Sequence, residues 1–336
     1  MLGVELFSGC GGLALGLSRA GVGHALLAER DAHSCATLRA NFGWTGTEIV
    51  QGDVRERDWT SLRGGVDVLA GGPPCQPFSL GGKHEAHHDR RDMWPEAIRA
   101  VREMRPKAFV FENVKGLART RFQDYLSWIV RSLERPANAG PYVTGAQSRT
   151  GPANPEGTPE YVVTVAKVNC ADFGAAQNRE RVLVLGVSSG VARNPVALSG
   201  ERSLAALLWD QWVDGGYWRR HGLTTPGDDC IPPRHRGRVR KMRESGLRPE
   251  ARPWRTVRDA LVGLGEPDGT RGHIHQPGAK TYPGHTGSPL DMPSKALKAG
   301  AHGVPGGENM MVRDDGSVRY FTVREAARLQ GFPDDW

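Results

Sequence analysis

The chain has 336 residues, of which 38% are hydrophobic, and its formal net charge is +7. It contains no stretch near the roughly 20 apolar residues of a membrane helix, and its N-terminus lacks the basic segment and cleavage site of a secretory signal peptide. The positive charge favours an anionic partner, nucleic acid before an anionic membrane surface.

The first 187 residues predict alternating strands and helices. Expected strands are 4–7, 25–28, 66–70, 108–111, 161–168 and 181–187, and expected helices are 13–20, 32–41, 94–105 and 122–133. Strands separated by helices indicate an α/β fold with a mostly parallel, doubly wound sheet, and we expect the last two strands to pair. Ligands of such sheets bind at the carboxyl ends of the strands.

The sequence changes character after about residue 188. From 188 to 310 the hydrophobic periodicity weakens, while Gly, Pro, Arg and Trp become frequent, which predicts a second, smaller and more irregular domain. Its most basic segment contains Arg234, His235, Arg236, Arg238, Arg240, Lys241 and Arg243. Residues 322–331 regain helical spacing, with Thr322 as the expected N-cap. We expect residues 311–336 to return to the first domain.

A glycine-rich turn, residues 7–12, follows the first predicted strand and precedes a helix. Glycines let the backbone approach a ligand, and the helix offers its N-terminal amides. Glu29 ends the second strand about 20 residues later, where an acidic residue commonly holds the hydroxyls of a ribose. Asp53 is placed to accept a hydrogen bond from an adenine amino group. The alternatives are a ligand-free turn and, for Asp53, a helix cap.

The sequence has five cysteines: Cys10, Cys35, Cys75, Cys170 and Cys230. Their number is odd and no CxxC pair occurs, which argues against a zinc ribbon or a thioredoxin-like site and favours a reduced, cytoplasmic compartment. Cys75 stands in Gly-Gly-Pro-Pro-Cys-Gln-Pro-Phe-Ser, residues 71–79. The flanking prolines hold it at a rigid loop position, whereas core cysteines lie in strands or helices. It is therefore a candidate nucleophile.

The loop after Cys75 continues to Asp92 with glycines and basic residues, which suits a lid over nucleic acid or, alternatively, a disordered basic loop. Glu112 and Asn113 follow the predicted strand 108–111, where a carboxylate and an amide can bind the Watson–Crick edge of a base. The alternatives for Glu112 are a helix cap and a surface ion pair. Arg179 and Arg181 stand two residues apart on an extended segment and point the same way. They could orient Glu112 or hold a base carbonyl.

Taken in order, FSGCGG, GGPPCQPFS, FENV and QNRERV resemble the sequence blocks of C5-cytosine DNA methyltransferases, and TVREAARLQGFPDD resembles a later block of that family. The resemblance covers nearly the whole chain. It implies the S-adenosylmethionine-dependent methyltransferase fold and no metal. It makes Cys75 the covalent nucleophile, with Glu112 and Arg181 gripping the cytosine and with Arg179 and Asn113 supporting them. Cofactor-binding residues would be Phe7, Gly9, Gly11, Gly12, Leu13, Glu29, Arg30, Asp53, Val54 and Pro74.

The resemblance also implies the reaction and its partner. Cys75 would add to C6 of a cytosine flipped out of duplex DNA, and the cofactor would leave as S-adenosylhomocysteine. Residues 188–310 would be the target-recognition region, with its arginines and tryptophans, although for each single tryptophan a place in the small-domain core is favoured over base contact: Trp209, Trp212, Trp218 and Trp254. We expect a bacterial, cytoplasmic enzyme of a restriction–modification system with a cognate endonuclease.

The chain departs from the family pattern at its end. Family members that begin with FSGCGG usually finish with a segment containing a Gly-Asn pair, and none follows the last block here. A truncated gene, a shortened chain, or a second polypeptide that supplies the segment would each explain this. Two alternatives therefore stay open: a transfer-RNA cytosine methyltransferase, and a DNA-binding subunit that is inactive without such a partner. The long segment before the last block favours the DNA enzyme.

Overall fold

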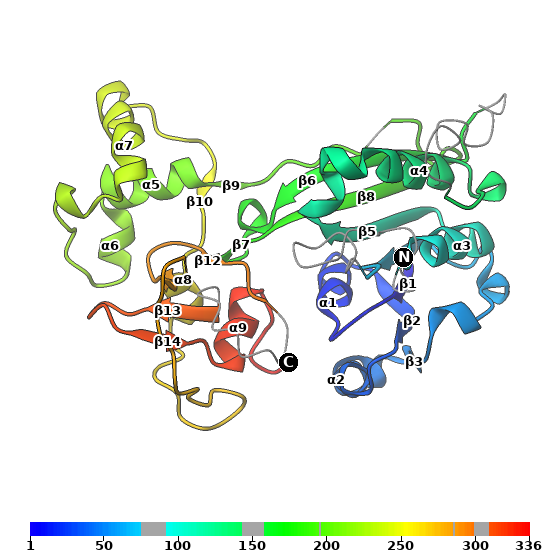
Figure 1. Ribbon diagram of the computed structural model, residues 1–336, viewed down its shortest axis with the longest axis horizontal. Coiled ribbons are helices and arrows are strands. Elements are labelled where there is room, and N and C mark those ends of the chain that lie inside the picture. The colour runs from blue at the N-terminus through cyan, green and yellow to red at the C-terminus, as the bar shows by residue number, and fades with distance from the viewer. Residues whose placement is uncertain (75–91, 143–157, 195, 285, 299–308) are drawn as a thin grey trace. The chain divides into compact units, whose positions relative to one another are not determined.

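The computed structural model describes residues 1–74, 92–142, 158–194, 196–284, 286–298 and 309–336 (Figure 1). Cys75, the predicted nucleophile, and the predicted lid up to residue 91 lie outside the described residues. The chain divides into two compact units, described separately below. Unit 1 comprises Met1–Val168 and Arg181–Leu198, and unit 2 comprises Asn169–Glu180 and Ser199–Trp336. No helix in the described ranges is long and apolar enough to cross a membrane.

A seven-stranded sheet with the order β3-β2-β1-β4-β5-β8-β6 forms the centre of unit 1. The strands are β1 (Leu2–Leu6), β2 (Gly23–Glu29), β3 (Glu48–Gln51), β4 (Val68–Gly71), β5 (Ala108–Val114), β6 (Tyr161–Asn169) and β8 (Glu180–Ser188). The first five pair in parallel and β8 runs antiparallel to β5. The predicted mostly parallel sheet and the pairing of the two late strands are thus confirmed. The short strand β3 was not predicted, because only two of its four residues are apolar.

The helices of unit 1 cover both faces of this sheet. They are α1 (Gly12–Arg19), α2 (Ala32–Phe42), α3 (Trp94–Met104) and α4 (Gln123–Glu134). Helices α3 and α4 share one apolar core with Val4 and Leu6 of β1. Ala14 of α1 and Leu38 of α2 are fully buried but lie outside that core, as expected for helices on the opposite face. Each helix lies within one residue of its predicted bounds.

Strand β5 is longer than predicted, and this changes the position of two candidate site residues. We expected Glu112 and Asn113 to follow the strand, but β5 continues to Val114. Its parallel partner β4 ends at Gly71, opposite Phe111. Antiparallel pairing with β8 continues to Val114, opposite Arg181, and supplies the hydrogen bonds that keep these residues extended.

Unit 2 contains five helices and seven short strands within the described residues. The helices are α5 (Leu204–Trp212), α6 (Gly216–Arg220), α7 (Pro233–Ser245), α8 (Val257–Leu261) and α9 (Val323–Leu329). The strands are β7 (Gln177–Asn178), β9 (Arg202–Ser203), β10 (Arg252–Pro253), β11 (Ser288–Pro289), β12 (Ser294–Lys295), β13 (Met310–Val312) and β14 (Val318–Tyr320). An apolar cluster joins α5, α6 and α7 and includes Trp212 and Trp218. These two tryptophans are therefore core residues.

Helix α9 packs in a second cluster of unit 2, with α8, β13 and β14. The hydroxyl of its N-cap Thr322 accepts a hydrogen bond from the Glu325 amide, and the Glu325 carboxylate accepts one from the Thr322 amide at 2.7 Å. Glu325 also pairs with both terminal nitrogens of buried Arg319, at 2.6 and 2.8 Å. The predicted N-cap is thus confirmed.

The compact units differ from the predicted domains in three places, the first being that residues 188–198, expected in the second region, belong to unit 1. Residues 311–336 belong to unit 2, whereas we expected them to return to the first domain. Asn169–Glu180 also belongs to unit 2, although it precedes the expected boundary at residue 188. The cause is the β7–β12 pairing, which ties Gln177 and Asn178 to residues far along the chain. The catalytic and target-recognition roles of these regions stay predictions.

Candidate active site

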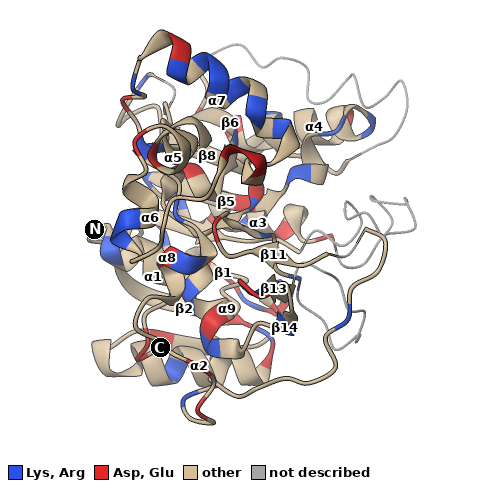
Figure 2. Cartoon of the chain, turned by 90° about the vertical axis from the view of Figure 1, so that its left-hand side faces the viewer, with Lys and Arg blue, Asp and Glu red and all other residues tan. Residues whose placement is uncertain are grey.

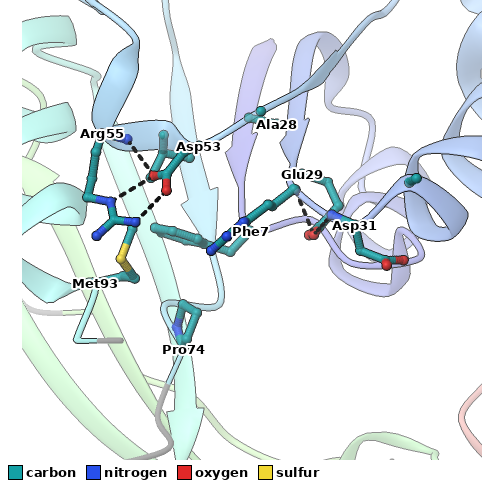
Figure 3. A pocket seen from close by; sticks show the side chains of 12 residues that line it. Phe7, Ala28, Glu29, Asp31, Asp53, Arg55, Pro74 and Met93 are labelled. Atoms are coloured by element: carbon teal, nitrogen blue, oxygen red, sulfur yellow. Dashed lines mark hydrogen bonds and ion pairs between the residues drawn. The ribbon is translucent and has the colours of Figure 1, made fainter. Parts of the chain in front are cut away.

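A cavity of about 600 Å³ opens beside the carboxyl ends of β1 and β2 (Figure 3). Six of the predicted cofactor-binding residues line it: Phe7, Glu29, Arg30, Asp53, Val54 and Pro74. Gly9, Gly11, Gly12 and Leu13 are not among the lining residues. Lining residues that sequence reasoning missed are Ala28, Asp31, Ala32, Gly52, Arg55 and Met93. Ala28, Asp31, Gly52 and Arg55 each adjoin a predicted site residue along the chain, which was the available signal, whereas Ala32 and Met93 do not.

Phe7 has an unusual backbone conformation directly after β1. Its φ is 57°, in the left-handed region that is costly for residues other than glycine. The side chain lies in the cavity, as Figure 3 shows. A Cβ atom added at Gly71 would lie 3.5 Å from the Phe7 ring and 2.7 Å from the Leu6 carbonyl oxygen. The chain that leads toward Cys75 therefore leaves β4 in close contact with the end of β1, which requires glycine at position 71.

The Glu29 carboxylate holds the glycine-rich turn against the end of β2. Its Oε2 accepts a hydrogen bond from the Gly9 amide at 2.7 Å, and its Oε1 accepts from the Arg30 and Asp31 amides at 2.7 and 2.8 Å. A carboxylate offers about four acceptor positions. These three bonds leave one, on Oε2, for a hydroxyl group of a ligand in the cavity.

We expect Glu29→Gln to weaken the binding of S-adenosylmethionine by about 10- to 100-fold, because charge-assisted hydrogen bonds of this kind contribute about 1.5–3 kcal/mol. The amide NH₂ group would face backbone N–H donors and release the turn. Calorimetric titration with the cofactor measures the effect. Glu48→Gln is the matched control, since the Glu48 side chain is 58% exposed and pairs with Arg57 at the surface. Equal affinities for the two variants would contradict the role given to Glu29.

Asp53 caps a helix and also lines the cavity. The helix cap and the ligand contact, which the sequence analysis gave as alternatives, are therefore compatible. It caps the short 3₁₀ helix Val54–Glu56, accepting from the Arg55 amide at 3.0 Å. Its carboxylate also accepts from Arg55 Nε at 3.0 Å and Nη2 at 2.5 Å. These hydrogen bonds lower the pKa of Asp53 to about 2. The carboxylate is therefore ionised near neutral pH and offers acceptors to a ligand.

Glu112, Asn113 and Arg181 come together where β5 pairs with β8. The Arg181 guanidinium forms an ion pair with the Glu112 carboxylate, and their side chains are 14% and 35% exposed. Asn113 is buried, and its amide nitrogen donates to the Pro73 carbonyl oxygen at 3.1 Å. A Cβ atom added at Gly72 would lie 3.6 Å from Glu112 Oε2. This cluster therefore adjoins the segment that leads directly to Cys75.

Arg179 lies in unit 2, so the two arginines that we expected to act together belong to different units. Its amide donates to Asn169 Oδ1 at 3.1 Å, and its carbonyl oxygen accepts from the Cys170 amide at 2.9 Å. The ion pair between Arg181 and Glu112 agrees with the expected orienting role of Arg181. A supporting role for Arg179 stays a prediction.

Glu5 is a buried carboxyl group that sequence reasoning missed. It lies in β1, is 1% exposed, and its Oε2 has no hydrogen-bond partner among the described residues. Burial and the nearby charge of Glu29 raise its pKa well above the usual range. Both effects disfavour the charged form of a carboxyl group. An acidic residue inside the apolar segment VELF was the signal in the sequence.

The profile of the family described as "C-5 cytosine-specific DNA methylase" matches residues 1–137. The chain is also 35% identical over 191 residues to the Type II methyltransferase M.AquIA of Picosynechococcus sp., an alignment that covers 54% of this chain and 70% of the relative. The chain belongs to the C-5 cytosine-specific DNA methylase family. The resemblance inferred from the motifs is thereby confirmed.

Other relatives of this methylase chain are matched over a smaller share of their length. It is 49% identical over 133 residues to the Type II methyltransferase M.PspPI of Psychrobacter sp., which covers 39% of this chain and 31% of the relative. It is 35% identical over 187 residues to M.NgoMIV of Neisseria gonorrhoeae, covering 55% of this chain and 51% of the relative. The matched part thus spans about a third to a half of these relatives.

Solved structures support the fold of the methylase. The S. pombe Dnmt2 methyltransferase matches with a TM-score of 0.58 and 14% identity, covering 100% of this chain and 87% of that one. The Entamoeba histolytica methyltransferase EhMeth matches with a TM-score of 0.55 and 13% identity, covering 99% and 87%. At this identity the similarity establishes the methyltransferase fold alone.

Proposed function

We propose that this methylase transfers a methyl group from S-adenosylmethionine to C5 of cytosine at a specific site in duplex DNA. The observation that carries the proposal is the cluster of Glu112, Asn113 and Arg181 against Gly72 and Pro73. It brings groups that can bind a pyrimidine edge next to Gly72 and Pro73, which precede Cys75 in the sequence. Family membership supports the same chemistry.

The chemistry requires a nucleophile because C5 of cytosine is unreactive by itself. The Cys75 thiolate forms a bond to C6 of a base that has left the helix stack. The electron pair of the C5–C6 double bond then becomes available at C5, and Glu112 in its protonated form stabilises this adduct by giving a proton or hydrogen bond to N3. After methylation the C5 proton passes to water or another base, the electrons of the C5–H bond restore the C5–C6 double bond, the bond from C6 to sulfur breaks, and Cys75 leaves as the thiolate. Arg181 keeps the Glu112 carboxyl group in place throughout.

The cavity in unit 1 fits the cofactor that this reaction needs. Its volume of about 600 Å³ is within the usual range for small-molecule sites. Glu29 has one acceptor position left for a ribose hydroxyl, and the ionised Asp53 beside apolar Val54 suits an adenine. S-adenosylmethionine, when bound, supplies an electrophilic methyl group.

Methyl transfer to two substrates tests this function. The full chain is incubated with labelled S-adenosylmethionine and either plasmid DNA or transfer RNA, and methylated DNA is then sequenced after bisulfite treatment. We expect label in duplex DNA, at cytosines within one short sequence. Label in transfer RNA alone would contradict the proposal. Transfer to DNA only after a second polypeptide is added would instead favour the partner-dependent subunit.

We also infer that the reaction takes place in the bacterial cytoplasm, in a restriction–modification system with a cognate endonuclease. The support is that the matched relatives are named Type II methyltransferases and come from bacteria. Restriction challenge of DNA from cells that express the chain would test this pairing once the methylated sequence is known.

A further inference from the structure

Helix α7 of unit 2 is held in place by one narrow apolar side. Val239 and His235 are buried, and Met242 packs against the same cluster of α5 and α6. Residues four and three apart share a helix face. Positions 235, 239 and 242 therefore form a single anchoring side, and the rest of the helix surface faces solvent.

Two arginines of α7 tie the helix to its surroundings. Arg243 donates to the Trp212 carbonyl oxygen at 2.8 Å and forms hydrogen bonds of 2.6 and 2.8 Å to the Asp228 carboxylate. Arg236 donates to the carbonyl oxygens of Ile231 and Asp229, both at 3.0 Å. The guanidinium groups of Arg236 and Arg243 are therefore already used in hydrogen bonds that stabilise unit 2.

The opposite flank of α7 carries three cations, of which Arg234 donates a hydrogen bond from Nε to His235 Nε2 at 3.1 Å. Arg234, Arg238 and Lys241 are exposed and stand four and three residues apart, so they line up along one face. Throughout the described part of the chain, none of them forms an ion pair with a carboxylate. Figure 2 shows Lys and Arg along most of this helix. We call Arg234, Arg238, Lys241 and the intervening Gly237 the open flank.

The open flank is unfavourable for the isolated helix. Like charges at these spacings repel each other, and a cation in the first turn opposes the helix dipole. Burial lowers the pKa of His235, and the charges of Arg234 and Arg238 lower it further. Gly237 is a poor helix former, and a Cβ atom added there would meet nothing within 4 Å. Features that cost stability without a packing reason commonly mark a binding surface.

We propose that the open flank of α7 binds the phosphate backbone of duplex DNA. This inference rests on the proposed function and assigns the contact to Arg234, Arg238 and Lys241. Three cations along about 10 Å of helix match a polymer that carries one negative charge per about 1.7 Å of its axis. Phosphates would relieve the repulsion along the flank, and Gly237 leaves space for the sugar–phosphate chain to approach the helix.

Phosphate contact differs measurably from base recognition and from an acidic protein partner. Each phosphate contact adds about 0.9 to the dependence of log K on log salt, and it acts equally on all sequences. The test variant is Arg234→Gln/Arg238→Gln/Lys241→Gln in the full chain. The control variant is Arg39→Gln/Arg63→Gln/Arg102→Gln, which removes three exposed cations from unit 1 and changes the net charge equally.

Binding to two unrelated 30-base-pair duplexes is measured between 50 and 250 mM KCl. We expect the test variant to lose about 2.7 from the salt slope and to bind both duplexes at least about 10-fold more weakly at 150 mM. Its melting temperature should equal or exceed that of the parent, because the repulsion is gone. The control variant should change the salt slope by less than about 0.9, the value expected for one phosphate contact.

Equal slopes for test and control variants, or a loss confined to one duplex, would overturn the inference while leaving the proposed function intact. Failure of the parent chain to bind or methylate DNA would overturn both. Gly237→Leu gives a second arm without a charge change. We expect it to raise the melting temperature and to weaken binding to both duplexes, since the side chain would occupy the space left for the phosphate chain. Unchanged binding by this variant would also count against the contact.

Discussion

Replacing Cys75 by serine is expected to lower the rate of methyl transfer by at least about 1,000-fold, the scale on which loss of a covalent nucleophile acts in other enzymes. The thiol of a cysteine is more readily converted to its nucleophilic anion than a serine hydroxyl, which needs a dedicated base. Affinities for DNA and cofactor should stay within about twofold, because the substitution is nearly isosteric.

Single-turnover kinetics with labelled S-adenosylmethionine, together with DNA-binding titrations, measure both parts of this expectation. Cys230→Ser is the matched control, since Cys230 is an exposed, free cysteine of unit 2. It should methylate at the parental rate. Substantial methylation by Cys75→Ser would rule out the assigned nucleophile, and a parallel loss in the control would point to a general effect of cysteine replacement.

Replacing Glu112 by glutamine is the second large effect, with an expected loss of about 10²- to 10⁴-fold in kcat, the range for removal of a general acid or base. Glutamine keeps the size of the side chain and can still accept a hydrogen bond from Arg181, so the end of β5 should keep its structure. It cannot hand a proton to N3 of the cytosine, and the adduct at C6 should form slowly.

A fall in kcat without a matching change in the Kd for DNA would identify Glu112 as a residue that acts in the reaction. Glu112→Gln should leave the Kd for DNA within a few fold while kcat falls, and the Glu48→Gln variant should match the parent in both. If Glu112→Gln lost DNA binding and kcat together, Glu112 would act in holding the structure rather than in the reaction. An unchanged kcat would remove it from the mechanism.

Local patterns were sufficient for most of unit 1, because its helices and strands carry clear periodicity. The end of β5 was not predictable in this way. Glu112 and Asn113 are polar residues that normally end a strand, but β8 pairs with them from about 70 residues further along the chain. The same pairing brings Arg181 to Glu112, a contact that the spacing of the two arginines made possible but could not establish.

Unit 2 was less predictable because few of its elements have enough apolar residues for a periodic signal. Helix α7 shows the difficulty, since its anchoring positions 235, 239 and 242 stand between charged neighbours. Its basic composition suggested an irregular segment, although the spacing of these three positions is helical. The separation of its arginines into structural and open groups depends on Asp228 and Trp212, whose positions only the fold supplies.

The cofactor cavity shows a finer limit. The sequence placed Glu29 and Asp53 at strand ends, and both line the cavity. The motifs did not indicate that the Glu29 carboxylate accepts hydrogen bonds from three backbone amides, or that the Asp53 carboxylate accepts hydrogen bonds from Arg55. Such occupancy depends on the turn geometry of the loops, which motif spacing does not determine.

The most direct test of the mechanism is covalent trapping on duplex DNA that carries 5-fluorocytosine at the methylated position. Fluorine replaces the C5 proton that must leave, so the bond between C6 and sulfur should persist after methylation. With S-adenosylmethionine present, we predict a complex that survives denaturation and whose cross-linked peptide contains Cys75. Cys75→Ser should give no complex. A cross-link at another residue, or efficient methylation of ordinary DNA without any trapped complex on the fluorinated duplex, would contradict covalent catalysis by Cys75.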